Sequence, residues 1–90
     1  MTEASIHAYQ LRLAVNFHRD VEDYKECGAT LCARLMEEFK HTDIDVFDVY
    51  AEPDCADILL EFTDTPLEYP SIEDIESTCR QAALDVLLNY

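Results

Sequence analysis

Hydrophobic and polar residues alternate along the first part of the chain, between Ile6 and Phe17. A two-residue period is typical of a β-strand with one buried face. The pattern predicts a strand whose polar side carries Gln10, Arg12 and Asn16. The apolar positions on its other side are Tyr9, Leu11, Leu13, Val15 and Phe17.

The next segment has the period of a helix, which we expect to run from Val21 to Lys40. Asp20 is the predicted N-cap, and Lys40 and His41 lie at the other end, where positive charge suits the helix dipole. Gly28 interrupts the segment and lowers its helix propensity, so we expect it to permit a close approach to the sheet or to another helix. Residues of the predicted inner stripe are Val21, Tyr24, Cys27, Gly28, Leu31, Leu35 and Phe39.

Two further strands are predicted from Ile44 to Ala51 and from Cys55 to Thr63. The first is rich in β-branched and aromatic residues, and the second alternates between apolar and polar positions. Between them, Glu52-Pro53-Asp54 has proline where a tight turn favours it. These two strands are therefore expected to form an antiparallel hairpin.

A second helix follows a predicted loop over residues 64–70 and begins with a capping-box-like serine, Ser71, with acidic Asp74 three residues later. Its stripe of apolar or small residues is Ile72, Ile75, Cys79, Ala82, Ala83, Val86 and Tyr90. Residues 1–90 are thus expected to form a single α+β domain in the order strand-helix-strand-strand-helix. We expect a two-layer sandwich with a three-stranded, mostly antiparallel sheet and both helices on one face. This order resembles a ferredoxin-like fold without its last strand, and it leaves the strand order open.

Composition adds an unusual charge to this picture, because 20 acidic residues face 6 Lys and Arg, for a net charge of −14. The hydrophobic fraction of 49% is nevertheless that of a folded domain. Nucleic acid and anionic membranes are polyanions, so direct binding to either is not expected. The sequence has no apolar run of membrane-spanning length and no signal-peptide pattern at its start, so we expect a cytoplasmic protein with free thiols.

Residues that could carry catalysis or bind a metal form no recognisable motif. A single glycine excludes a glycine-rich phosphate loop, and the cysteines include no Cys-x-x-Cys pair. Asp43, Asp45 and Asp48 only faintly resemble a calcium loop. We therefore expect no enzyme activity, no cofactor and no bound metal. The scattered candidate ligands are Cys27, Cys32, Cys55, Cys79, His7, His18 and His41.

The acidic residues are concentrated in one part of the chain, because no Lys, Arg or His occurs from Thr42 to Cys79. Alternate residues of a strand point the same way at about 6.6–6.8 Å. Neighbouring phosphates of one DNA strand are separated by a similar distance, roughly 6–7 Å. Asp43 and Asp45 have this spacing, and Asp57 and Glu61 lie four residues apart on one face. A rigid sheet with these carboxylates is expected to present a phosphate-like pattern to a protein groove built for nucleic acid.

Small size, acidity and the lack of an active-site motif resemble the phage and mobile-element inhibitors of CRISPR, restriction or DNA-repair enzymes. The resemblance rests on size and charge, and it implies a nucleic-acid mimic whose partner is a basic nucleic-acid-binding protein. The predicted binding residues are Asp43, Asp45, Asp48, Glu52, Asp54, Asp57 and Glu61, with Tyr50 and Tyr69 as aromatic anchors.

Other interpretations remain open. Acidity can simply keep a surface solvated, or it can reflect adaptation to salt. The end of the second helix is apolar nearly all round, which indicates either closure of the core or a contact surface for a homodimer. A homodimer through this end would have to point its acidic hairpins outward, because the two subunits repel each other. A separate alternative to the mimic is an adaptor, a subunit or an immunity protein that binds its partner through this apolar surface. The residues of that surface are Leu84, Leu87, Leu88 and, at its edge, Tyr90.

Overall fold

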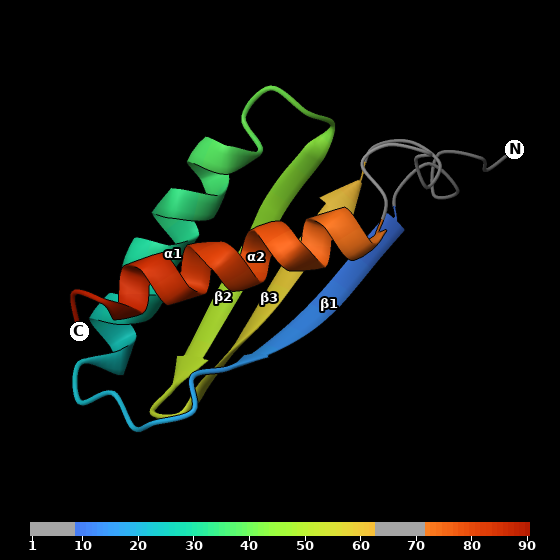
Figure 1. Ribbon diagram of the computed structural model, residues 1–90. Coiled ribbons are helices and arrows are strands. Elements are labelled where there is room, and N and C mark those ends of the chain that lie inside the picture. Colours follow the sequence, from blue (N-terminus) through green and yellow to red (C-terminus); the bar gives the residue numbers. More distant parts are fainter. Residues whose placement is uncertain (1–8, 63–71) are drawn as a thin grey trace, which may run out of the picture.

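The computed structural model describes residues 9–62 and 72–90. Within them the chain forms an open three-stranded sheet and two helices, which is the predicted α+β class (Figure 1). The start of the first predicted strand, the 64–70 loop and the Ser71 cap lie outside the described residues. The elements are β1 (Tyr9–Asn16), α1 (Tyr24–Glu38), β2 (Ile44–Glu52), β3 (Cys55–Phe62) and α2 (Ile72–Leu87).

The strand order is β1-β3-β2, so the strand that comes last in the chain lies in the middle of the sheet. Both neighbours of β3 run antiparallel to it. The predicted hairpin between β2 and β3 is confirmed, with Pro53 and Asp54 as its two turn residues. This turn also holds the chain after β1, because the Phe17 amide donates to the Asp54 carbonyl (2.8 Å) and the Val21 amide to the Pro53 carbonyl (2.7 Å).

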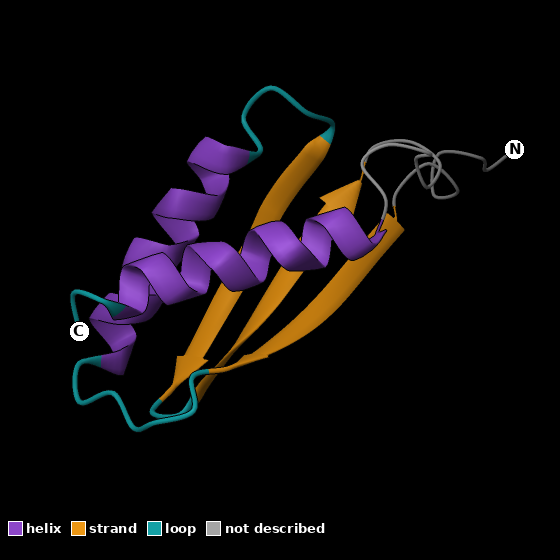
Figure 2. Cartoon of the chain, in the orientation of Figure 1, coloured by secondary structure: helices purple, strands orange, loops and turns teal. Residues whose placement is uncertain are grey.

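Both helices cover the same face of the sheet and leave the other face open (Figure 2). The alternation of β3 explains why this face is buried, since Ala56, Ile58 and Leu60 are fully enclosed while the residues between them remain partly exposed. Leu31 and Leu35 of α1 complete the centre of the core. None of the described helices has the length and apolar character needed to cross a lipid bilayer.

Gly28 allows α1 to lie very close to β2, which is one of the two close approaches that the sequence left open. A Cβ atom placed on Gly28 would be 2.6 Å from the Cβ atom of Ala51. Because real Cβ atoms essentially never approach so closely, any larger residue at position 28 would push the helix away from the sheet.

The predicted ends of α1 were wrong by a few residues. The helix begins at Tyr24, so Asp20 does not cap it and Asp23 occupies the N-cap position without a side-chain cap bond. The hydrogen bond from Val21 to the hairpin turn, together with burial of the Val21 side chain, holds that residue outside the helix. At the other end the helix stops at Glu38, so Lys40 lies beyond its last turn.

Candidate functional site

The face of the sheet that neither helix covers, called here the open face, carries polar side chains from all three strands. β3 places its outward residues between those of β1 and β2 in four rows. The rows are Gln10–Glu61–Asp45, Arg12–Leu59–Asp48, Ala14–Asp57–Tyr50 and Asn16–Cys55–Glu52. Five carboxylates from two adjacent strands are therefore gathered on one surface, although the sequence alone does not show which strands are neighbours.

A β-bulge in β2 decides which acids belong to this face. The pairing with β3 skips Phe47, because Val46 lies opposite Leu60 and Asp48 lies opposite Leu59. Without the extra residue, strict alternation from Asp45 would turn Asp48 toward the helices. The bulge instead returns Asp48 to the side of Asp45, and both are exposed.

Part of the open face is hollowed into a groove of about 540 Å³. Tyr50, which is 62% exposed, lies in this groove, where an aromatic ring can contact a partner. The other residues lining the groove are Arg12, Asp48, Glu52, Asp57 and Leu59.

Among the described residues of this face, Arg12 is the one positive charge beside the carboxylates. Arg12 donates to Asp57 at 2.6 Å, and this hydrogen bond raises the pKa of the guanidinium further. Gln10 donates to Glu61 at 3.0 Å. In the part of the chain that the structure describes, no cation pairs with Asp45 or Asp48. The face therefore has an excess of negative charge toward solvent.

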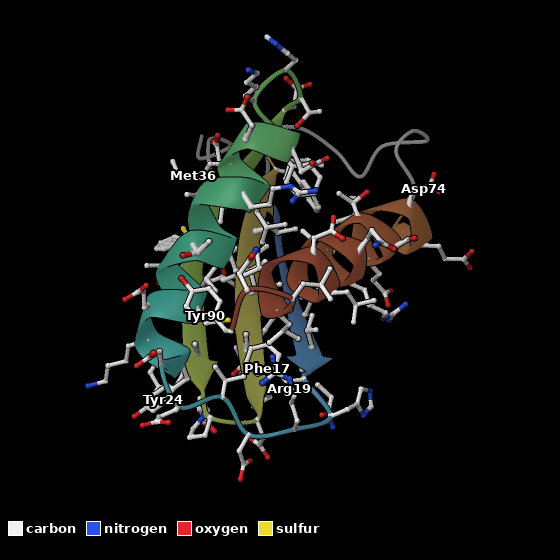
Figure 3. The ribbon with its side chains drawn as sticks, turned by 60° about the vertical axis from the view of Figure 1, so that its left-hand side comes forward. Phe17, Arg19, Tyr24, Met36, Asp74 and Tyr90 are labelled. Carbon is white, nitrogen blue, oxygen red and sulfur yellow. The ribbon has the colours of Figure 1, made fainter. Side chains whose placement is uncertain are left out.

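Two of the other basic residues, Arg19 and Arg34, hold the helical layer together. Arg34 joins α1 to α2 through Asp85 at 3.0 Å and also contacts Glu38 at 3.1 Å. Arg19 donates to the Leu87 carbonyl at 2.7 Å, at the C-terminal end of α2, where a positive charge is favourable (Figure 3). These contacts lie on the helical layer and do not neutralise the open face.

The other predicted binding residues lie at the ends of the face or outside it. Asp43 is exposed just before β2, and Asp54 is exposed in the hairpin turn at the other end of that strand. Tyr69 lies outside the described residues. Sequence reasoning missed Arg12 and Leu59 as parts of this surface. The polar side of β1 was visible in the alternation, but its position beside β3 depends on the strand order.

The predicted contact surface at the end of α2 is divided by the fold. Leu87 is buried, while Leu84 and Leu88 are 49% and 85% exposed. Tyr90 turns toward α1, where its hydroxyl lies 2.8 Å from the Thr30 hydroxyl (Figure 3). The apolar end of the helix therefore contributes to the core and also leaves two leucines in contact with solvent.

None of the four cysteines has the features of a nucleophile. Burial raises the pKa of Cys79 to about 12, and the Glu76 carboxylate adds to this effect. Burial also raises the pKa of Cys27, Cys32 and Cys55. All four thiols are thus protonated at neutral pH, whereas the thiolate is the reactive form.

The hairpin turn brings Glu52, Asp54 and Cys55 together, with one potential metal ligand from each within 4.8 Å of the others. Glu52 and Asp54 are exposed, and the Cys55 sulfur lies 3.8 Å from a Glu52 carboxylate oxygen. After burial, these carboxylates are the largest causes of the raised pKa of the Cys55 thiol. Since a thiol must lose its proton to bind a metal, the neighbouring acids oppose its use as a ligand.

Comparison with protein-family models finds no matching family, and comparisons with curated proteins and with solved structures find no significant match. The open face, with its geometry and its excess of negative charge, is therefore the feature of the molecule that bears on function.

Proposed function

We propose that this protein is an inhibitor that mimics nucleic acid and uses its open face to occupy the groove of a basic nucleic-acid-binding protein, such as a CRISPR, restriction or repair nuclease. The observation that carries the proposal is the gathering of five carboxylates on the uncovered side of one rigid sheet. A groove built for phosphates attracts such a surface by charge complementarity.

The spacing of the acids supports this role. Neighbouring strands are separated by about 4.8 Å, and residues two apart on a strand by about 6.6–6.8 Å. Asp57 and Glu61 lie on one strand, two such steps apart, with Asp45 opposite Glu61 on the next strand. The carboxylates thus form a fixed array in which Asp57 and Glu61 are roughly 13 Å apart, about twice the separation of neighbouring backbone phosphates, which is roughly 6–7 Å.

The array also imposes a cost on folding. Asp45 lies directly opposite Glu61, and like charges in such a cross-strand pair are destabilising. Gln10 relieves only part of this repulsion, through its hydrogen bond to Glu61. An arrangement that opposes stability but concentrates charge on a rigid surface is more readily explained by binding than by folding.

The proposal is tested by comparing two variants that change the net charge equally. Asp45→Lys/Asp48→Lys reverses two acids of the open face, and Glu22→Lys/Glu37→Lys reverses two exposed acids elsewhere. Wild type and both variants are immobilised and used to capture proteins from a host lysate. Bound proteins are then eluted with a salt gradient and identified by mass spectrometry.

We expect wild type and the Glu22/Glu37 variant to retain a basic nucleic-acid-binding protein that moderate salt releases and that added DNA or RNA displaces. The Asp45/Asp48 variant should lose this protein while keeping its fold, as judged by circular dichroism. Equal retention by the two variants, or a partner that nucleic acid does not displace, would contradict the proposal.

A further inference from the structure

β1 is an edge strand, and along its outer side it pairs with no other strand of the described residues. All eight of its residues pair with β3 on the inner side. In an edge strand, alternate backbone amides and carbonyls point outward without partners. β1 therefore presents a row of main-chain donors and acceptors that suits another extended chain.

The two edges of the sheet differ in how well they are protected against such pairing. β2, the opposite edge, is interrupted by the bulge at Phe47 and carries Asp45, Asp48 and Glu52. Bulges and charges are the usual devices that block edge-to-edge association. The register of β1 is continuous, and the strand contains neither an acid nor a proline. Its one charged residue, Arg12, is held by Asp57 of β3.

The helices do not fully cover the sheet beside β1. A groove of about 380 Å³ lies between β1 and α2, and Leu84 borders it. Leu11 and Leu13 face the core but are only partly buried, whereas Val15 on the same face is 9% exposed. An added strand with apolar inward side chains would cover these leucines and fill the groove. The groove is lined by Ala14, Val15, Asn16, His18, Arg80, Ala83, Leu84 and Leu87.

Charge identifies the best occupant of this edge. In a chain of net charge −14, the groove and β1 contain no carboxylate, so a contact between two copies here brings no acidic side chains of these elements together. β1 also provides the apolar alternation that the groove requires. The acids of the open face lie on β2 and β3, away from this contact.

We propose that two copies of this chain associate through their β1 edges to form a continuous six-stranded sheet around a two-fold axis. In an antiparallel pair, opposing residues must point to the same side of the sheet. A register centred on Leu13 meets this condition, with Leu13 opposite its own copy and Leu11 opposite Val15 of the second copy. Centring on Arg12 would instead place two like charges opposite each other, which is destabilising.

This association has a salt dependence opposite to that of the proposed inhibition. The contact consists of main-chain hydrogen bonds and apolar side chains, while the two subunits repel each other through their net charges. Salt screens that repulsion, so the dimer should become tighter as the salt concentration rises. Binding of the open face to a basic partner should become weaker. The dimer does not depend on the proposed function, and the two ideas can fail separately.

The test is sedimentation equilibrium over a range of protein concentrations at low and high salt, with amide hydrogen exchange of β1. Leu84→Glu introduces a negative charge at the groove. Met36→Glu is the control, because it introduces the same charge at an exposed apolar residue of α1 (56% exposed). Leu84→Gln serves as a milder second variant if the charged one does not fold.

We expect wild type and Met36→Glu to dimerise more tightly at high salt, with β1 amides that become protected as the concentration rises. Leu84→Glu should weaken the dimer at least tenfold, and Leu84→Gln should weaken it less. A monomer at all concentrations would overturn the proposal, even if a strand of another protein were found to bind the β1 edge. The proposal would also be overturned by a dimer whose dissociation constant neither Leu84 variant changes, or by a dimer in which the β1 amides stay unprotected.

Discussion

Substitution of Gly28 by alanine offers a direct test of how α1 is held against the sheet. In an exposed helix this change would stabilise the protein by about 0.5–1 kcal/mol, because alanine has the higher helix propensity. Here the new Cβ atom would lie 2.6 Å from the Ala51 Cβ atom. Ordinary carbon contacts are about 3.5–4.0 Å, so the helix must retreat by about 1 Å.

The expected result is therefore a loss of stability. Overpacking of this kind costs about 1–3 kcal/mol, which exceeds the gain in propensity and leaves a net loss of roughly 0.5–2 kcal/mol. For a domain of this size, each kcal/mol lowers the melting temperature by roughly 4–8 °C. Urea unfolding followed by circular dichroism gives the free energy, and thermal unfolding checks it.

Two further variants make the test specific. Ala29→Gly changes an exposed residue of α1 and calibrates the propensity effect in the same helix. Ala51→Gly removes the opposing Cβ atom, so the Gly28→Ala/Ala51→Gly double variant should recover at least about 1 kcal/mol relative to the sum of the single changes. If Gly28→Ala is as stable as wild type, or if the two changes are additive, the close approach of helix and strand is refuted.

Two other predictions follow from the buried thiol and from the open face. The pKa of Cys79 is about 12 in the folded protein against 9.0 for a free thiol, so its contribution to stability is complete below pH 9 and is lost as the pH rises toward 12. The free energy of unfolding should fall by about 1.4 kcal/mol per pH unit in that window. Urea titrations of Cys79→Ala should show a free energy of unfolding that depends less steeply on pH. An equal slope in wild type and Cys79→Ala would contradict the raised pKa of this thiol. Arg12→Gln removes the cation that the described residues place on the open face, so the captured basic partner should elute at higher salt. The melting temperature should change little, because an exposed ion pair contributes little to stability. Elution at unchanged or lower salt would count against the face as the binding surface.

The local pattern of the sequence was sufficient to predict the elements. Alternation identified β1 and β3, and the Glu52-Pro53-Asp54 turn identified the hairpin, because these features depend on neighbours in the chain. The start of α1 was misplaced because the Val21 amide is bound by Pro53, a residue more than thirty positions away. Neither capping preference nor periodicity contains information about such a contact.

The candidate site also combines features that the local sequence predicts with features that depend on strand pairing. An acid-rich hairpin was evident from composition, and Asp57 and Glu61 were correctly expected on one face. The bulge at Phe47, which returns Asp48 to that face, depends on the pairing with β3. The partial neutralisation of the acids by Arg12 likewise depends on β1 lying beside β3 instead of beside β2.

By itself, then, the sequence determined the α+β class, the approximate strands and helices and the excess of acid between residues 42 and 79. It left open whether Gly28 approaches the sheet or another helix, and the structure places it against Ala51 of β2. Only the tertiary structure decided the strand order and which residues lie on the open face. It also decided that Leu87 is buried while Leu84 and Leu88 are exposed. The physical reason is that propensity and periodicity act over a few residues. Strand pairing and burial instead join segments that are distant in the chain, and the packing of the whole core selects among the arrangements that local patterns allow.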